Sequence, residues 1–518
     1  MKNPFLLSAS LAAALLAAPP APVRAQTAGD ADLAHRTFLN AEHLLQEGKT
    51  EQAMKDYQQV VQAFPDSAWA DDALMRLGSN QYPAESLSGL AKAGLAAQDA
   101  ARPFFEQVRE RYPESDSAPA ALYKLGLLSL EPRSPRRNLD EAYASFSRVV
   151  NIYPGSDWVG PAHVGAAFAE MGKASYDHAV LSLERGLQEM PRGAAAAEAH
   201  YLLGVCNARM GDPVRSAESF QQSRLDNPGG PLAGRALDWL TLLYRLRILT
   251  KAGKTPHYER SVAFVPAPPP GTDLRGDVRI AVSPTGELAV ADPKEGRVLT
   301  FRSSGQLADN TPFTDPILVA FDAFGGLMTV GRGHIAADGK DQPLAKQDGS
   351  KTRPVEKIGG AWRAAGKGIW ILDTGDGELL LYGADLSQPK VLVTDKAAGV
   401  RMSALAAGPD DLIYVLDEKS DGVLVLQDGG LDPLTRGGAT AGFEDPVALA
   451  TDALGDIYVL DAKRKVVEIL GPDGGHLATI APPAGSPAEM EGPASLAVGP
   501  GGEVYVYDER KRTILLYD

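Results

Sequence analysis

The chain has 518 residues, of which 44% are hydrophobic and 23% are charged, and its formal net charge at pH 7 is −15. Because a single core stops growing at about 250–300 residues, this length predicts two domains. The acidic balance argues against nucleic acid or an anionic lipid surface as a partner, and the only cysteine, Cys206, excludes an internal disulfide.

The N-terminus has the layout of a secretory signal peptide. Lys2 precedes an uncharged apolar run over residues 5–18, and a proline-broken stretch ends at Ala25. This run is shorter than the roughly 20 residues that span a bilayer, and no cysteine near Ala25 could carry a lipid anchor. We therefore expect cleavage after Ala25 and a mature chain that is periplasmic or secreted.

A proline-containing phrase recurs in the first half of the chain. The five prolines are Pro65, Pro113, Pro154, Pro191 and Pro228, at spacings of 48, 41, 37 and 37 residues. Twelve residues before each proline stands a small residue, and eight before it a large apolar one. The small residues are Ala53, Ala101, Ala142, Ala179 and Ser216, and the large ones are Tyr57, Phe105, Phe146, Leu183 and Phe220. A small residue lets two antiparallel helices approach, the large one fills their seam, and proline ends the second helix, so each unit is predicted to be a helical hairpin.

These positions resemble the tetratricopeptide repeat, and the Tyr-Pro-x-Ser endings resemble the subclass found in periplasmic and outer-membrane assembly proteins. Residues 79–98 and 131–137 depart from the family pattern as insertions, which we expect to be loops that leave the stack intact. Residues 231–250 keep the helical period without the terminal motif, which is typical of a capping helix. Residues 26–250 are thus predicted to form an all-α solenoid of about five hairpins and a capping helix.

Residues 251–260 are predicted to be a linker, because the hydrophobic period beyond them alternates as in strands. Short apolar stretches then end at six positions, with aspartate at five of them and glycine at one: Asp292, Gly331, Asp373, Asp417, Asp461 and Asp508. Their spacings of 39, 42, 44, 44 and 47 residues fit one four-stranded propeller blade each. The second domain, residues 261–518, is therefore predicted to be an all-β six-bladed propeller closed by a strand at residues 261–265.

This second repeat resembles the NHL-repeat family of propellers. The resemblance implies a platform that binds protein, nucleic acid or glycan. Residues 256–518 hold 38 of the 66 acidic residues, which argues against nucleic acid.

Several residues invite a chemical interpretation that their surroundings do not favour. The repeated aspartates are expected to accept backbone hydrogen bonds in the turn after the second strand of each blade. The segment 373–378 lacks the ligand spacing of a helix-loop-helix calcium site, the eight histidines lack zinc spacing, and Cys206 lies in an apolar helix. Neither a phosphate-binding loop nor a nucleophile elbow occurs. We therefore predict no catalytic residue, no metal site and no cofactor.

The function predicted from these patterns is an extracytoplasmic protein–protein interaction scaffold in the cell envelope. A peptide groove on the solenoid would be lined by first-helix residues three before the signature glycine position: Phe38, Met75, Tyr123 and Tyr201. The propeller would offer a second face, and the partners would be envelope-associated proteins. Two alternatives stay open: a metal-dependent lactonase-like or lyase-like hydrolase with non-repeating His, Asn or Glu at the propeller channel, and an envelope polysaccharide-binding protein that exposes Trp362 or Trp370.

Overall fold

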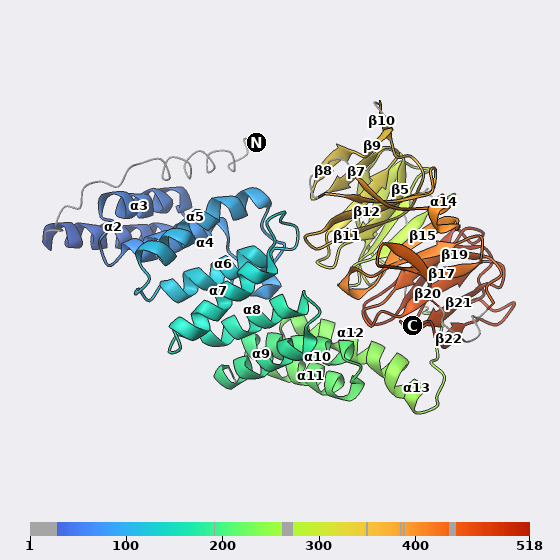
Figure 1. Cartoon of the computed structure of the whole chain (residues 1–518), viewed down its shortest axis with the longest axis horizontal. Coiled ribbons are helices and arrows are strands. Elements are labelled where there is room, and N and C mark those ends of the chain that lie inside the picture. The colour runs from blue at the N-terminus through green and yellow to red at the C-terminus, as the bar shows by residue number, and fades with distance from the viewer. Residues whose placement is uncertain are drawn as a thin grey trace. The chain divides into compact units, whose positions relative to one another are not determined.

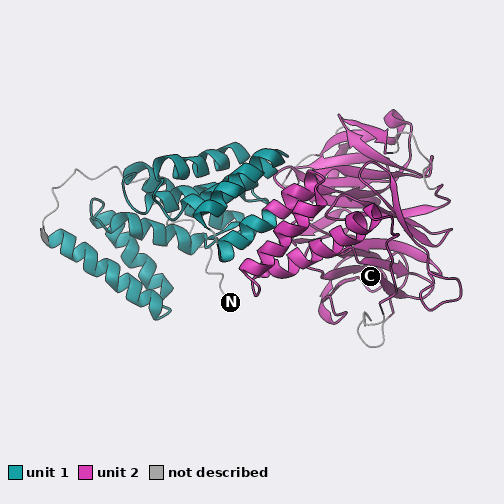
Figure 2. Ribbon diagram, turned by 90° about the horizontal axis from the view of Figure 1, so that it is seen from below, with its two compact units in different colours: residues 1–202 teal, residues 203–518 magenta. Residues whose placement is uncertain are grey.

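The computed structural model describes residues 28–190, 192–261, 273–348, 351–383, 386, 389–434 and 442–518. Helices α2 to α13 lie within residues 28–251, and the strands, with the short helix α14 among them, follow from residue 279 (Figure 1). The predicted signal peptide lies outside the described residues. The chain divides into two compact units, Met1–Leu202 and Leu203–Asp518 (Figure 2), and each is considered by itself.

Unit 1 is a series of antiparallel helical hairpins. Its helices are α2 (Ala28–Gln46), α3 (Thr50–Ala63), α4 (Ala70–Gln81), α5 (Leu95–Arg111), α6 (Ala118–Leu130), α7 (Leu139–Ile152), α8 (Val159–Met171), α9 (Tyr176–Glu189) and the first part of α10 (Ala194–Arg209). The predicted seam residues Ala53, Ala101, Ala142 and Ala179 and their partners Tyr57, Phe105, Phe146 and Leu183 are all 0% exposed. The hairpins predicted from the proline spacing are confirmed.

Glycine in the first helix of a hairpin sets how closely the two helices approach. A Cβ added at Gly126 of α6 would lie 2.6 Å from ring atoms of Phe146 in α7, and one at Gly78 of α4 would lie 2.6 Å from the ring of Phe105 in α5. These distances are shorter than real Cβ contacts, so only glycine allows the aromatic ring to lie directly on the backbone of the neighbouring helix.

Unit 2 begins with helices and continues into the propeller. After the end of α10 come α11 (Pro213–Asp226) and α12 (Pro231–Leu243), which runs through a π-helical turn η3 (Tyr244–Ile248) into α13 (Leu249–Lys251). The predicted capping helix therefore forms one continuous helix with a single π turn. The boundary between the compact units falls inside α10, whereas the sequence predicts a linker at residues 251–260.

Charged side chains join the last helices to two propeller turns. The guanidinium of Arg247 donates to both carboxylate oxygens of Asp456, at 2.7 and 2.9 Å. Arg209 donates to the carbonyl oxygen of Ala453 at 2.6 Å, and Arg245 donates to that of Gly502 at 3.2 Å. These contacts link the end of α10 and the π turn η3 to the propeller within unit 2.

Six antiparallel sheets form the six-bladed β-propeller, and strand order within each blade follows chain order. The first two blades are β1 (Arg279–Val282), β2 (Leu288–Asp292), β3 (Arg297–Phe301) and β4 (Leu307–Pro312), and β5 (Pro316–Phe321), β6 (Leu327–Gly331), β7 (His334–Ala337) and β8 (Lys340–Pro343). The third and fourth blades are β11 (Ile358–Ala364), β12 (Gly368–Asp373), β13 (Glu378–Tyr382) and β14 (Lys390–Thr394), and β15 (Met402–Ala407), β16 (Ile413–Asp417), β17 (Gly422–Gln427) and β18 (Gly430–Pro433). The fifth and sixth blades are β19 (Pro446–Thr451), β20 (Ile457–Asp461), β21 (Val466–Leu470) and β22 (His476–Ile480), and β23 (Pro493–Val498), β24 (Val504–Asp508) and β25 (Thr513–Tyr517). A separate hairpin, β9 (Ala345–Asp348) with β10 (Lys351–Pro354), follows the second blade, and a short helix α14 (Asp395–Ala398) follows the third.

The last blade has three strands of its own, and an upstream segment pairs with its outer strand. Residues 259–261 form this pairing: Glu259 exchanges two backbone hydrogen bonds with Asp518 (3.0 and 2.9 Å), and the Ser261 N–H donates to Leu516 O at 2.8 Å. Pairing of this kind covers a sheet edge that would otherwise be open. The predicted closing strand spans residues 261–265, of which residues 262–265 lie outside the described residues.

The aspartate at the end of the second strand anchors the main chain. Asp461 accepts from the N–H of Arg464 at 2.9 Å and from that of Glu444 at 2.8 Å, and Asp508 makes the equivalent pair of bonds. All five aspartates accept a backbone N–H from the turn that follows, and none is more than 4% exposed: Asp292, Asp373, Asp417, Asp461 and Asp508. Their predicted structural role is confirmed.

The second blade, which has Gly331 at this position, uses a different device. The imidazole of His334 bonds to Thr314 O through Nε2 (2.9 Å) and to Asp341 Oδ1 through Nδ1 (2.8 Å). A Cβ at Gly331 would lie 2.3 Å from His334 Nε2, so glycine makes room for the ring. Burial lowers the pKa of His334, but the bonds to Asp341 and Thr314 outweigh it and leave the pKa above its usual value.

Candidate functional site: the first-helix face of the repeats

The four residues predicted to line a peptide groove lie on the first helices of their hairpins. Phe38, Tyr123 and Tyr201 are 7%, 2% and 6% exposed, and Met75 is half-buried. The Tyr123 ring packs against that of Trp158, with centroids 5.0 Å apart. Three of the four thus contribute mainly to packing between helices, and Met75 has the most accessible surface. Their role in binding stays a prediction.

The first insertion, between α4 and α5, is packed against first helices rather than extended into solvent. It contains a single 3₁₀ turn, η2 (Leu87–Gly89). Its apolar side chains are buried, with Tyr82, Ala84, Leu87 and Leu90 at most 8% exposed. We call residues 82–94 the insertion loop, and the face formed by α2, α4, α6, α8 and residues 194–202 of α10 the first-helix face.

Three charged side chains of the first-helix face hold the main chain of the insertion loop. Lys124 of α6 donates from Nζ to the carbonyl oxygen of Ala84 at 2.5 Å. Two carboxylates accept backbone N–H groups at 3.0 Å each, Glu198 of α10 from Ser88 and Glu131, at the end of α6, from Ala91. Side chains from two different hairpins therefore bind the backbone of one irregular segment.

Burial shifts the pKa of each of these groups toward its neutral form. It raises the pKa of Glu198 to about 7, and the N–H groups of Ser88 and Leu87 oppose part of that rise. It also raises the pKa of Glu131, whose carboxylate accepts the Tyr82 hydroxyl at 2.6 Å, and lowers that of Lys124. The loop is thus held by groups whose charge is sensitive to how completely the loop covers them.

The second insertion, residues 131–137, contacts the first. Arg133 donates to the carbonyl oxygen of Ala91 at 3.3 Å, and Arg136 forms an ion pair at 2.9 Å with Asp99 of α5, the helix that follows the first insertion. The two insertions therefore contact each other on the same face, whereas the sequence predicted only that they are loops that leave the stack intact.

Two groups of carboxylates in the described residues are spaced closely enough for a cation. Asp71, Asp72 and Asp116 in unit 1 range from buried to exposed, and burial raises the pKa of Asp72. The second group lies in the propeller within the segment considered above for calcium. There Asp373, Asp376 and Glu378 surround the ammonium group of Lys346, with Nζ–O distances of 2.6, 2.5 and 2.5 Å. The Lys346 side chain is only 6% exposed, so a lysine of the β9–β10 hairpin occupies the position that a metal ion would take.

The two tryptophans considered for glycan binding form one cross-strand pair in the third blade. Trp362 of β11 lies opposite Trp370 of β12, and both are half-buried against the core of the propeller. Trp362 Nε1 donates to Asp411 at 3.1 Å.

Sequence reasoning missed Lys124, Glu131 and Glu198 as binding groups. A signal existed for one of them, because Lys124 is the only charged residue within α6 and a lysine inside so apolar a helix needs a specific partner. No such signal marks Glu198, whose partner Ser88 is 110 positions away in the chain.

Comparisons with known proteins gave matches to both halves of the chain. The tetratricopeptide repeat family matches residues 41–67 and 120–156. A thermophilic tetratricopeptide-repeat protein from Thermus thermophilus is 15% identical over 40% of this chain and 100% of its own, with a TM-score of 0.30. Virginiamycin B lyase from Staphylococcus aureus is 12% identical over 49% of this chain and 82% of its own (TM-score 0.34). Regucalcin, a calcium-binding protein from Agrobacterium tumefaciens, is 15% identical over 47% and 90% (TM-score 0.33).

A search of curated proteins gave no match. The structural similarities are too distant to inform on activity. The chain combines tetratricopeptide repeats with a six-bladed β-propeller, and folds of these two kinds support protein interaction in general.

Proposed function

We propose that the protein is an extracytoplasmic adaptor in which the first-helix face of the repeats binds one protein partner and the propeller binds a second. Extended repeat surfaces bind segments through many modest contacts. Two such surfaces on one chain raise the local concentration of one partner near the other.

The insertion loop is the observation that carries this proposal. Its main chain is bound by Lys124, Glu131 and Glu198, which project from two first helices. A backbone N–H or carbonyl group of a partner segment could use the same kinds of donor and acceptor. The first-helix face therefore already recognises an irregular peptide segment within its own chain.

The propeller has two ends, and the hydrogen bonds described for the last helices all reach the same one. Arg247 and Arg245 reach Asp456 and Gly502, which belong to the turns between the first and second strands of the last two blades. The turns after the second strands lie at the opposite end, because antiparallel strands alternate in direction. We assign the second partner to that end of the ring.

We assign the protein to the periplasm or to the secreted fraction, with association to envelope proteins. The support is the signal-peptide pattern of residues 1–25. None of the described helices combines the length and the apolar character that crossing a membrane requires.

We assign binding rather than catalysis to the propeller. A carboxylate cluster that could have held a divalent ion instead binds Lys346, and the five repeated aspartates anchor turns. The metal-dependent hydrolase and polysaccharide alternatives remain testable by adding divalent ions and lactone or glycan substrates to the same preparation.

The proposal is tested by capture with the full mature chain, residues 26–518, from an envelope extract of the source organism. A Met75→Glu variant places a charge on the predicted groove, and a Leu181→Glu variant changes a 53% exposed residue of the second helix α9 as the matched control. The expected result is a protein retained by the wild type and by Leu181→Glu but not by Met75→Glu. Retention of no specific protein, or equal retention by both variants, would contradict the proposal.

A further inference from the structure

The repeat register identifies which face of a first helix is covered by its own second helix. The signature glycine stands thirteen residues after Pro65, Pro113 and Pro191, and alanine takes this place after Pro154. Gly78, Gly126 and Gly204 each lie against an aromatic ring of the second helix, and an added Cβ would come within 2.6 to 2.7 Å of that ring. This position therefore marks the seam inside a hairpin.

In the capping helix the same count from Pro228 reaches Thr241. Thr241 is exposed, and none of the described residues that follow α13 forms a second helix beside α12. It continues through the π turn into α13 and then leads to the propeller strands. Among the described residues, no helix therefore covers the face of α12 that would form the seam of a sixth hairpin.

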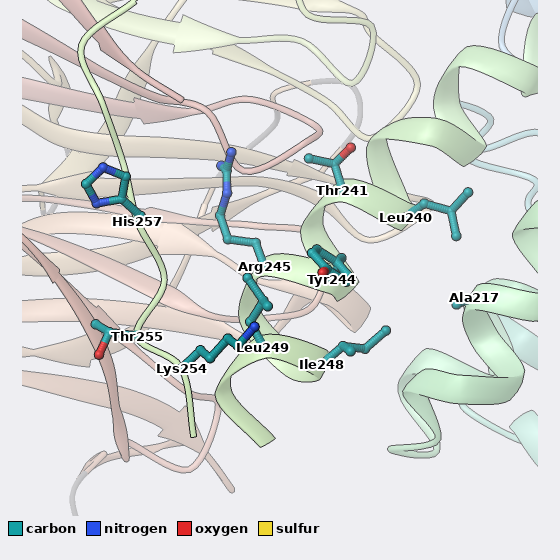
Figure 3. A pocket seen from close by; sticks show the side chains of 10 residues that line it. All are labelled: Ala217, Leu240, Thr241, Tyr244, Arg245, Ile248, Leu249, Lys254, Thr255 and His257. Atoms are coloured by element: carbon teal, nitrogen blue, oxygen red, sulfur yellow. The ribbon is translucent and has the colours of Figure 1, made fainter. Parts of the chain in front are cut away.

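A cleft with a volume of about 570 Å³ lies at this uncovered face. Figure 3 shows Leu240, Thr241 and Tyr244 on the helix, with Ala217 of α11 on the opposite side. We call it the α12 cleft, and it is lined by Ala217, Leu240, Thr241, Tyr244, Arg245, Ile248, Leu249, Lys254, Thr255 and His257. Two adjacent helices thus present the groove into which the second helix of a further repeat would pack.

The lining is apolar in the middle and basic at its edge. Tyr244 is 56% exposed, a large fraction for an aromatic side chain beside other apolar groups. All three ionisable side chains at the edge are basic. Arg245 lies over the Tyr258 ring, at 4.6 Å, and His257 pairs with Glu259, whereas Lys254 has no ion-pair partner among the described residues.

We propose that the α12 cleft docks an acidic amphipathic helix of a partner protein, packed as the second helix of a sixth hairpin. Its apolar face would cover Leu240, Tyr244 and Ile248, and its acidic flank would face Lys254. This helix-in-groove mode specifies the partner class and rests on the proposed function as an adaptor.

We expect the partner helix to carry a small residue at the seam. In the three earlier hairpins glycine on the first helix faces a bulky aromatic ring on the second. Thr241 brings a Cβ to that position, so a ring in the same place would overlap it. Glycine, alanine or serine on the partner helix restores the close approach, because the larger residue of the pair is then Thr241 on α12 and the smaller one is on the partner.

The test is selection of displayed helices on the full mature chain. The library has fourteen residues, the length of α3, α7, α9 and α11, with fixed apolar positions and a randomised seam residue and flanks. Thr241→Phe fills the cleft, and Leu237→Phe, one turn away at a 47% exposed residue outside the cleft, is the matched control. Lys254→Glu reverses the charge at the edge.

The expected result is enrichment of helices with a small seam residue and acidic flanks. Their binding should weaken at least about tenfold in Thr241→Phe and stay unchanged in Leu237→Phe. Lys254→Glu should remove the acidic preference. The proposal is overturned if the wild type enriches no helices relative to Thr241→Phe, or if the enriched helices carry a bulky seam residue or basic flanks. It is also overturned if sedimentation shows that the chain forms dimers that depend on Thr241. Its failure leaves capture through Met75 unaffected, so the two proposals fail separately.

Discussion

Replacing Arg247 with methionine should strongly destabilise the junction between the capping helix and the propeller. The Asp456 carboxylate is 0% exposed and receives both of its Arg247 bonds at 2.7 to 2.9 Å. Removing one partner of such a pair leaves a buried, unpaired charge and costs about 3–5 kcal/mol. Because the Arg247 side chain is 26% exposed, water can reach part of the pair, and we expect the free energy of unfolding to fall by about 3 kcal/mol, near the lower end of this range.

Neighbouring groups make the loss harder to relieve. Asp452 lies beside Asp456 and is also buried, and burial raises the pKa of both carboxyl groups. The Tyr458 hydroxyl already donates to Asp452 at 3.1 Å. A protonated or neutral residue at position 456 should therefore recover part of the stability, so Asp456→Asn is expected to cost less in the Arg247→Met background than in the wild type.

The assay is urea unfolding of the full mature chain, combined with amide hydrogen exchange over residues 243–251. Arg401→Met is the control, because Arg401 pairs with Glu418 at the surface with side chains 74% and 46% exposed, and such pairs contribute little. The reasoning is refuted if Arg247→Met and Arg401→Met lose similar free energies of unfolding, or if exchange over residues 243–251 does not accelerate in Arg247→Met.

Three further outcomes follow from single contacts. His334→Gln should lose more stability at pH 5.5 than at pH 8.5 in urea unfolding. The reason is that a raised pKa of His334 stabilises the fold below the unfolded value of about 6.5, and this contribution disappears as the pH rises through the folded pKa. An equal loss at both pH values would contradict this prediction. Gly126→Ala should cost about 1–3 kcal/mol through overlap with Phe146, whereas Gly155→Ala, which has open space, should be neutral in the same melts. Lys346→Met should cost about 3 kcal/mol at pH 7, because it leaves the buried Asp373 carboxylate without its cation. Lys346 lowers the pKa of Asp376, so the difference from the wild type should shrink as the pH falls below the unfolded value of about 3.9 and through the lowered pKa of Asp376; a pH-independent difference would argue against the ion cluster.

The hairpins were predictable because their pattern is local and repeated. A small residue and a large one four positions apart, followed by proline, recur five times, and every one of these small and large residues is 0% exposed. The blades were predictable for the same reason, since each aspartate bonds within its own turn.

Contacts between distant segments could not be read from such patterns. Glu198 binds Ser88 across 110 positions, and Arg247 binds Asp456 across 209. Neither pair repeats, so no periodicity marks it, and the insertion loop differs from an ordinary surface loop only through these contacts. The buried state of Tyr123 and Tyr201 has the same origin, because a first-helix residue at groove spacing can point toward a partner or toward neighbouring helices.

The claim that the repeats bind a protein partner is tested most directly by hydrogen exchange on the mature chain with and without the captured partner. The account predicts added protection within residues 28–202, concentrated in the first helices and the insertion loop, and additional protection at Leu240 to Leu249 if the partner also uses the α12 cleft. Protection confined to the propeller strands, with residues 28–251 unchanged, would contradict it.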